Sequence, residues 1–370
     1  MVPGPVRAPR VRSAAAGQAV ARSAAAFRLV TVRLLAVLAA AGACLLGLAA
    51  PAAAHAGGAR PSNWVSTVDS VAPAMAGVTV RTLANGNVTE LVNTSPVTIT
   101  VLGYDGEPYL RIGPRGTEEN ARSAAAYLNR TLDSRSTVPD SAADPAVARA
   151  SPDWRSLSSE PIWRWHDHRT HWMESTPPPP VRAEPDRPHE IARWQLDFLY
   201  GQTPVAVTGR LVWVPPPSPW PYAGLAVAGL AAGAMAGWSR RWWRPALGGL
   251  LGVLAASGVA HAAAERSPVD AMTAAVGLGL AVAAFVAIRR SRPSAPYLLA
   301  LTGAVVLAVD GMAGLGALTA SQLPAGGPAW VVRLSVALAL GLGLGLVVGG
   351  WQVWRREQPV PAATEAVPSA

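Results

Sequence analysis

The sequence predicts a mixed fold, in which an external all-β, sandwich-like (Ig-like) domain precedes an α-helical transmembrane bundle of about five helices. The chain of 370 residues is 51% hydrophobic but only 14% charged, whereas ordinary soluble domains have about 25% charged residues. Long apolar runs follow residue 221. The region before it consists of short β-branched segments separated by turn residues.

The charge distribution excludes a nucleic-acid partner. The formal charge is +9 and all 31 basic residues are arginine, but such a balance favours nucleic-acid binding only when it covers one surface. Residues before 55 include 6 arginines and no acidic residue, residues 55–220 include 15 arginines and 17 acidic residues, and the remainder includes 10 and 5. The only segment long enough for a soluble domain is therefore slightly acidic.

Residues 1–54 are predicted to be a secretory signal peptide. Six arginines without an acidic residue precede the apolar run Leu34–Ala50, and small residues follow it. Cleavage after Ala54 would leave His55 as the mature N-terminus, whereas cleavage after Ala56 would remove it. The single cysteine falls within this segment, so the mature chain has no thiol for disulfides, nucleophilic catalysis or cysteine-based zinc sites.

The next segment, residues 55–214, is predicted to form one extracytoplasmic β-sandwich domain. The dipeptides Asn85-Gly86 and Asp105-Gly106 indicate hairpin turns because both tolerate positive φ. Several short strands without a long helical pattern favour a sandwich. The predicted strands are Val78–Leu83, Val88–Val92, Val97–Leu102, Pro108–Ile112, Ile191–Phe198 and Val205–Trp213.

Two irregular segments complete this region. Residues 132–160 are rich in Ser, Asp, Ala and Pro, which predicts a long surface excursion. The Pro-rich residues 215–221 predict a stiff, extended tether. This tether would hold the β domain close to the membrane.

Residues 222–354 are predicted to cross the membrane five times, and residues 355–370 to form a cytoplasmic tail. Each apolar stretch is near the roughly 20 residues that a helix needs to span a bilayer. The predicted spans are Tyr222–Trp238, Ala246–Ala264, Ala271–Ile288, Tyr297–Leu318 and Trp330–Trp351.

The arginines between the spans predict the orientation. Arginine clusters follow the first, third and fifth spans, at residues 240–244, 289–292 and 355–356, whereas the other two loops include only Arg266. Because cytoplasmic loops are enriched in arginine, the β domain is expected outside and the C-terminus in the cytoplasm. The expected location is the cell membrane, with the protein crossing it several times.

Glycine spacing predicts close helix packing at three spans. Glycines four residues apart lie on one face of a helix and allow a neighbouring backbone to approach. They are Gly229, Gly233 and Gly237 in the first span, Gly248 and Gly252 in the second, and Gly341, Gly345 and Gly349 in the fifth.

Two ionisable residues inside the spans are candidates for an intramembrane function. Asp310 lies in the fourth span, where an acid costs roughly 2.5–3.5 kcal/mol and usually faces a partner or a cavity. His261 lies near the outer end of the second span, with Glu265 one helical turn further on. These groups can form a proton or metal path. Alternatively, Asp310 packs against Arg333 or a hydroxyl group, and His261 is an interfacial residue.

A second candidate site lies in the segment Trp163–Met173, which includes three of the six histidines. On a strand, His166 and His168 would share a face, whereas on a helical turn His168 and His171 would do so. Either geometry can bring two imidazoles to one metal ion. The alternative is an aromatic-rich loop whose histidines bind no metal.

Copper is the predicted metal. The third imidazole, Asp167, the thioether of Met173 or the α-amine and imidazole of His55 can complete the site. Imidazole suits Cu(II) and thioether suits Cu(I), so histidines with methionine and no cysteine favour copper over zinc. No G-x-S-x-G, H-E-x-x-H or P-loop motif is present, so the sequence favours a non-enzymatic role.

Several sequence segments resemble those of a known family. They are Val101–Gly113, Glu119-Asn120, Tyr127–Asn129, Trp165–Met173 and Pro217–Trp220. Together they resemble a family of actinobacterial envelope proteins with a signal peptide, an external β domain with a WHDHRxHxM-type motif and C-terminal transmembrane helices. The resemblance implies this architecture and an association with copper.

Two functional hypotheses follow from the sequence. In the first, a multi-pass envelope protein binds copper through His166, His168 and His171, with Met173 and His55, for homeostasis or delivery. In the second, a non-catalytic interaction or structural protein uses its β domain to bind a protein or cell-wall partner. A membrane-embedded enzyme is a third possibility that has only Asp310, His261 and Glu265 in its favour.

Overall fold

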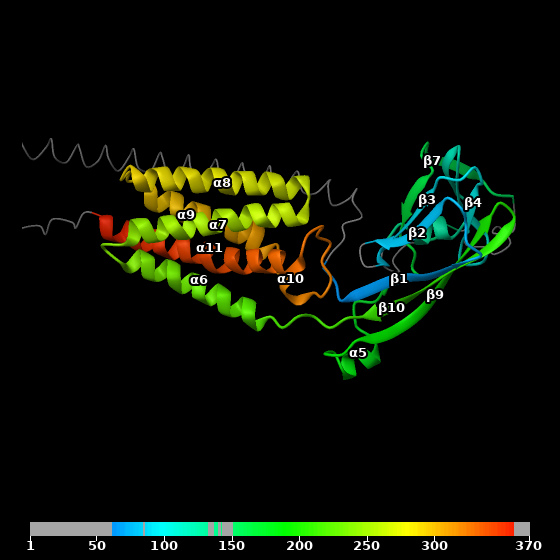
Figure 1. Cartoon of the computed structure of the whole chain (residues 1–370), viewed down its shortest axis with the longest axis horizontal. Coiled ribbons are helices and arrows are strands. Elements are labelled where there is room, and N and C mark those ends of the chain that lie inside the picture. Colours follow the sequence, from blue (N-terminus) through cyan, green and yellow to red (C-terminus); the bar gives the residue numbers. More distant parts are fainter. Residues whose placement is uncertain (1–60, 84–85, 132–136, 140–141, 143–150, 359–370) are drawn as a thin grey trace, which may run out of the picture. The chain divides into compact units, whose positions relative to one another are not determined.

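The computed structural model describes residues 61–83, 86–131, 137–139, 142 and 151–358 (Figure 1). The predicted signal peptide, His55 and most of the predicted cytoplasmic tail lie outside the described residues. Within the described part, antiparallel strands occupy residues 64–213 and apolar helices follow them.

The strands form two antiparallel sheets. One has seven strands in the order β1-β10-β9-β4-β5-β6-β7, and the other has three in the order β2-β3-β8. Two short helices, α2 (Ala125–Leu128) and α5 (Pro179–Ala183), lie in the connections. The strands are β1 (Trp64–Ala72), β2 (Val78–Leu83), β3 (Val88–Asn93), β4 (Ile99–Leu102), β5 (Pro108–Gly113), β6 (Gly116–Asn120), β7 (Trp154–Ser158), β8 (Ile162–Trp165), β9 (His189–Tyr200) and β10 (Thr203–Trp213).

All six predicted strands are present, as β2, β3, β4, β5, β9 and β10. Four further strands, β1, β6, β7 and β8, were not predicted. Strand β7 falls within residues 132–160, where we expected only a surface excursion, and it pairs with β6 at the edge of the sheet. Strand β6 is polar in sequence, and the Arg111–Glu118 ion pair joins it to β5. Cross-strand pairs of this kind stabilise a sheet without an apolar pattern in the sequence.

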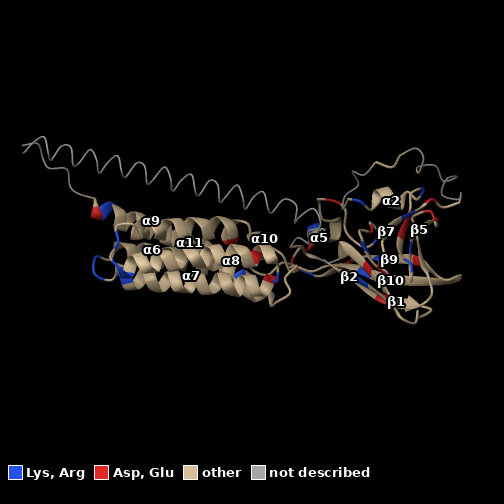
Figure 2. Cartoon of the chain, turned by 90° about the horizontal axis from the view of Figure 1, so that it is seen from above, with Lys and Arg blue, Asp and Glu red and all other residues tan. Residues whose placement is uncertain are grey.

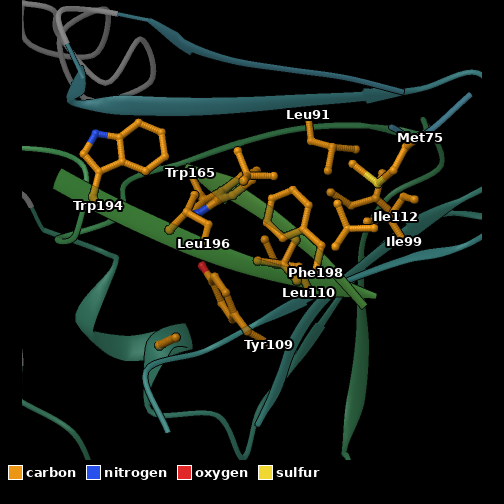
Figure 3. Packing of buried hydrophobic residues seen from close by; sticks show 14 of the residues in the cluster. Met75, Leu91, Ile99, Tyr109, Leu110, Ile112, Trp165, Trp194, Leu196 and Phe198 are labelled. Atoms are coloured by element: carbon orange, nitrogen blue, oxygen red, sulfur yellow. The ribbon is translucent and has the colours of Figure 1, made fainter. Parts of the chain in front are cut away.

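The two sheets share one hydrophobic core. Leu91 and Trp165 come from the three-stranded sheet, and Ile99, Leu110 and Phe198 come from the seven-stranded sheet (Figure 3). All five side chains are buried. Strand β10 alternates buried and exposed residues, as expected for a strand with one face toward a core.

Glu90 is a buried charge on the three-stranded sheet. Its side chain is 1% exposed and accepts hydrogen bonds from Nε of Arg81 and Nε of Arg164, each at 2.6 Å. Burial raises the pKa of Glu90, but the hydrogen bonds and charges of the two arginines outweigh burial and lower it below the usual 4.5. Glu90 therefore contributes stability as a carboxylate.

Replacement of Glu90 by Gln should lower the free energy of unfolding by about 1–3 kcal/mol at pH 7, because charge-assisted hydrogen bonds are lost. The carboxylate contributes fully above its unfolded-state pKa, and its contribution disappears as pH falls through the lower folded-state pKa. The difference between wild type and variant should therefore shrink below about pH 4.5. Denaturant unfolding followed by tryptophan fluorescence from pH 7 to 3 measures it. The exposed Glu190, paired with Arg193, provides the control Glu190→Gln, which should cost under about 1 kcal/mol. An equal loss in both variants would contradict this role of Glu90.

Among the described residues, four helical segments are long and apolar enough to cross a membrane: Trp243–Glu265, Pro268–Arg289, Ala295–Thr319 and Ala329–Glu357. The third contains the π-helix described below. The predicted first span corresponds to the 19-residue helix α6, which is not among these four. The helices are α6 (Trp220–Trp238), α7 (Trp243–Glu265), α8 (Pro268–Arg289), α9 (Ala295–Val306), the π-helix η2 (Leu307–Met312), α10 (Gly316–Thr319) and α11 (Ala329–Glu357).

Two of the three glycine faces, those of α6 and α11, pack against each other, whereas a Cβ added at Gly252 in α7 would meet no atom within 4 Å. A Cβ added at Gly345 would lie 2.8 Å from the carbonyl oxygen of Gly229 and 3.2 Å from Cα of Gly233. A Cβ added at Gly349 would lie 2.8 Å from the oxygen of Gly233. The two backbones therefore touch, as small residues at a membrane helix interface allow.

Replacement of Gly233 by Ala should separate these helices, because the new methyl group would overlap the backbone of Gly345. We expect a loss of about 1–3 kcal/mol of unfolding free energy, the usual cost of overpacking. The matched control is Gly224→Ala in the same helix, where an added Cβ meets no atom within 4 Å. Thermal unfolding in detergent should show a lower Tm for Gly233→Ala alone, and equal effects would argue against the contact.

Candidate functional site

The histidine-rich segment forms a tight turn directly after β8, which ends at Trp165. The carbonyl oxygen of Asp167 accepts hydrogen bonds from the amide of Thr170 at 3.0 Å, from its hydroxyl at 2.9 Å and from Nδ1 of His171 at 2.9 Å. Three donors thus converge on one backbone oxygen. These bonds fix the shape of the turn.

A buried ion pair between Asp167 and Arg169 stabilises the turn. The Asp167 side chain is fully buried, and Nε and Nη2 of Arg169 each donate to one of its oxygens at 2.8 Å. The indole nitrogen of Trp165 donates to the same carboxylate at 3.2 Å. The guanidinium of Arg169 also stacks on Tyr104, with Cζ 4.8 Å from the ring centroid. Asp167 is therefore occupied by Arg169 and Trp165, which contrasts with its predicted role as a possible metal ligand.

Tyr104 joins the turn to the hairpin between β4 and β5. Its hydroxyl accepts a hydrogen bond from the amide of His168 at 3.1 Å and donates to Oδ1 of Asn129. Burial, and next the negative charge of Asp167, raise the pKa of Tyr104 far above its usual value. The phenol therefore stays protonated and acts as a neutral hydrogen-bonding group.

Each imidazole of the segment has one ring nitrogen on a backbone carbonyl. Nδ1 of His166 lies 2.5 Å from the oxygen of Asn87, Nε2 of His168 lies 2.8 Å from that of Thr131, and Nδ1 of His171 bonds to Asp167. A carbonyl only accepts, so these nitrogens bear the hydrogen and a neutral ring has its lone pair on the opposite nitrogen. A backbone carbonyl partner of this kind commonly orients metal-binding histidines.

The structure brings two of the three predicted imidazoles together. The ring centroids of His168 and His171 are 5.6 Å apart, with an interplanar angle of 86°. Metal–nitrogen bonds of about 2.0–2.1 Å would place two imidazoles on one ion with centroids roughly 5–6 Å apart. Within the described residues, no group of three His, Cys, Asp or Glu side chains is close enough to bind one ion. The arrangement corresponds to the helical-turn alternative rather than the strand alternative.

The other predicted ligands lie differently. Met173 is 40% exposed two residues after His171, and His55 lies outside the described residues. The isolated His189 is at the start of β9, where Nε2 lies 2.7 Å from the oxygen of Glu184. Met173 is thus available from solvent but has no described contact with the histidine pair.

The two intramembrane candidates lie in different elements. Asp310 is in η2 and His261 is in α7, with Glu265 one turn further. Arg333 donates to the carbonyl oxygens of Ala317, Ala320 and Ser321 at 2.8–3.1 Å. Asp310 therefore does not pair with Arg333, and this predicted packing contact is corrected, because the end of α10 offers the guanidinium three backbone acceptors.

The sequence did not indicate the roles of Tyr104 and Asn129. They lie 64 and 39 residues before His168 in the chain, so only tertiary contacts connect them. The sequence does contain a signal for the ion pair, because the oppositely charged Asp167 and Arg169 lie two residues apart in an aromatic segment. The sequence analysis interprets Asp167 only as a possible metal ligand.

Comparison with models of known protein families, with curated proteins and with solved structures found no match for the chain.

Replacement of Arg169 by Met should lower the free energy of unfolding by about 3–5 kcal/mol, because it leaves the Asp167 carboxylate buried without its charge partner. The control is Arg155→Met, which removes an exposed pair with Asp153 and should cost under about 1 kcal/mol. Denaturant unfolding followed by tryptophan fluorescence would compare them. If Arg169→Met cost no more than the control, the ion pair would not stabilise the turn.

Proposed function

We propose that this protein is a multi-pass envelope membrane protein whose external β domain binds copper for homeostasis or delivery. In this proposal α6 is the first of five spans, the β-sandwich lies outside the cell and the C-terminus is cytoplasmic. Secretion through the N-terminal signal peptide would place the β domain there.

The distribution of arginines along the helices supports the orientation. In the helical bundle, arginines predominate at one end and acidic side chains at the other, and each end has some residues of both kinds (Figure 2). Arg241, Arg244 and Arg355 each lie over the ring of a nearby tryptophan, 4.8–5.3 Å from its centroid. Arginine and tryptophan together are typical of the cytoplasmic membrane interface.

The pairing of His168 and His171 is the observation that supports copper binding most directly. Their separation suits a shared ion, and backbone carbonyls orient both rings. Imidazole and thioether are the soft ligands that the mature chain offers, and this combination favours copper over zinc. His166, Met173 and His55 are the proposed further ligands, and they would have to move toward the pair.

One observation favours the second candidate function, binding of a protein or cell-wall partner. The Asp167 carboxylate is paired with Arg169 within the turn. Ile162 and Met173, which flank the turn in sequence, are 39% and 40% exposed. A partner that contacted both side chains would cover their apolar surface.

The test is competitive titration of the full chain in detergent with Cu(I), Cu(II) and Zn(II). We expect wild type to bind one copper ion and to bind zinc more weakly. The double variant His168→Ala/His171→Ala should lose at least about 100-fold in copper affinity, since removal of groups in or beside a metal site costs 10–100-fold or more. The surface variant His189→Ala is the matched control and should bind as wild type does.

Each outcome separates the two functions. Copper binding that survives in the folded double variant would overturn the site. Folded wild type that binds no copper would remove the metal function and leave the partner-binding function. N-terminal sequencing of the mature chain would decide whether His55 can take part.

A further inference from the structure

Asp310 lies within a local change of helix geometry. Helix α9 ends at Val306, and Leu307–Met312 form the π-helix η2 before the chain continues toward α10. Short π-helical segments are rare inside membrane helices and frequently occur at functional positions. The six residues of η2 include no proline that would impose it. The widened turn therefore coincides with the only acid of this span.

The Asp310 carboxylate faces α7 at a residue without a side chain. A Cβ added at Gly258 would lie 3.9 Å from Oδ2 of Asp310. A cavity of about 10 Å³, which is room for one water molecule, lies between α7, α8 and α9, and both residues line it. The remaining lining is apolar except for Thr302, whose hydroxyl donates to the carbonyl oxygen of Leu298 at 2.7 Å.

The Asp310 side chain has no hydrogen bond or ion pair with any described residue. Arg333, the nearest arginine on α11, donates to the carbonyl oxygens at the end of α10 instead. Helix α9 has no charged residue. A lone carboxylate inside a membrane helix is energetically costly, and uptake of a proton reduces that cost because it removes the charge.

Further ionisable groups lie on the neighbouring helices. His261 is three residues after Gly258 on the same face of α7, and its Nδ1 is buried without a hydrogen-bond partner among the described residues. Glu265 follows one turn later, and Asp270 is in the first turn of α8. His261 therefore lies on the face of α7 that Asp310 approaches at Gly258. Acidic side chains gather near α8 and α10 in this part of the bundle (Figure 2).

We propose that Asp310 binds an exchangeable proton inside the membrane and passes it to His261 and then to Glu265 at the outer end of α7. In the first step the carboxylic acid of Asp310 becomes a carboxylate and the imidazole of His261 becomes an imidazolium. In the second step Glu265 takes the proton and His261 returns to the neutral form.

A proton fits this site better than a metal ion does. Within the described residues, no three His, Cys, Asp or Glu side chains lie close enough to bind one ion. The proposed proton site does not involve His168 or His171, so its test does not depend on whether the β domain binds copper. The only ligand that we propose for Asp310 is a proton.

The test uses the full chain in lipid vesicles and dicyclohexylcarbodiimide, an apolar reagent that adds to protonated carboxyl groups within membranes. Peptide mass spectrometry would locate the N-acylurea product. We expect labelling at Asp310 with a rate that falls about tenfold for each pH unit above its midpoint, as the protonated fraction does. A water-soluble carbodiimide should label exposed acids and leave Asp310 unreacted.

Two variants test the path. His261→Gln should shift the midpoint of the pH profile at Asp310, because it removes the imidazole that exchanges a proton with this carboxyl group, whereas Glu357→Gln at the far end of α11 should leave it unchanged. Circular dichroism would check that each variant is folded. The pH profile of the wild type tests the proton site even if a variant does not fold. Absence of labelling at every pH, or labelling that does not vary with pH, would overturn the proton site. An unchanged midpoint in folded His261→Gln would overturn the role of His261.

Discussion

The helical bundle depends on the contact of α11 with two neighbours at backbone distance. Its glycines lie on two faces: Gly345 touches the backbone of α6, while Gly343 would place a Cβ 3.0 Å from the carbonyl oxygen of Gly303 in α9 and 3.1 Å from Cβ of Leu307. In lipid there is no hydrophobic force between helices, so close van der Waals contact holds them together. The second contact is at the start of η2. The packing that places α11 at the centre thus also positions the segment that contains Asp310.

The β domain has a comparable dependence on one buried pair. Asp167 and Arg169 shape the turn, and the histidines on either side follow from that shape. Side chains that are ordered during folding need no further ordering on binding, so the proposed copper site would be preorganised at His168 and His171.

The elements that the sequence predicted are those with a strong local pattern. Strands β9 and β10 have β-branched and aromatic residues around a turn, and the apolar helices have the length of a bilayer. Strand β6, with two glutamates in five residues, forms only because β5 and β7 pair with it. The π-helix packs closely against α11, where a Cβ added at Gly311 would lie 3.1 Å from Cδ2 of Leu340, and no local sequence pattern records this contact.

The candidate sites were predictable to different degrees. The clustering of His168 and His171 was visible as spacing, although their meeting required the turn that Asp167 and Thr170 form. The free carboxylate of Asp310 could be found as a charge in an apolar run. Its neighbour Gly258 could not be predicted, because the order of residues in the sequence does not show which glycine lies opposite an acid on another helix.

The position of strand β10 has a mechanical consequence. The strand lies between β1 and β9, pairs antiparallel with both, and leads within a few residues into α6. A pulling force on that helix would load two hydrogen-bonded ladders in shear at once, so the attachment of the domain would resist tension at its strongest point.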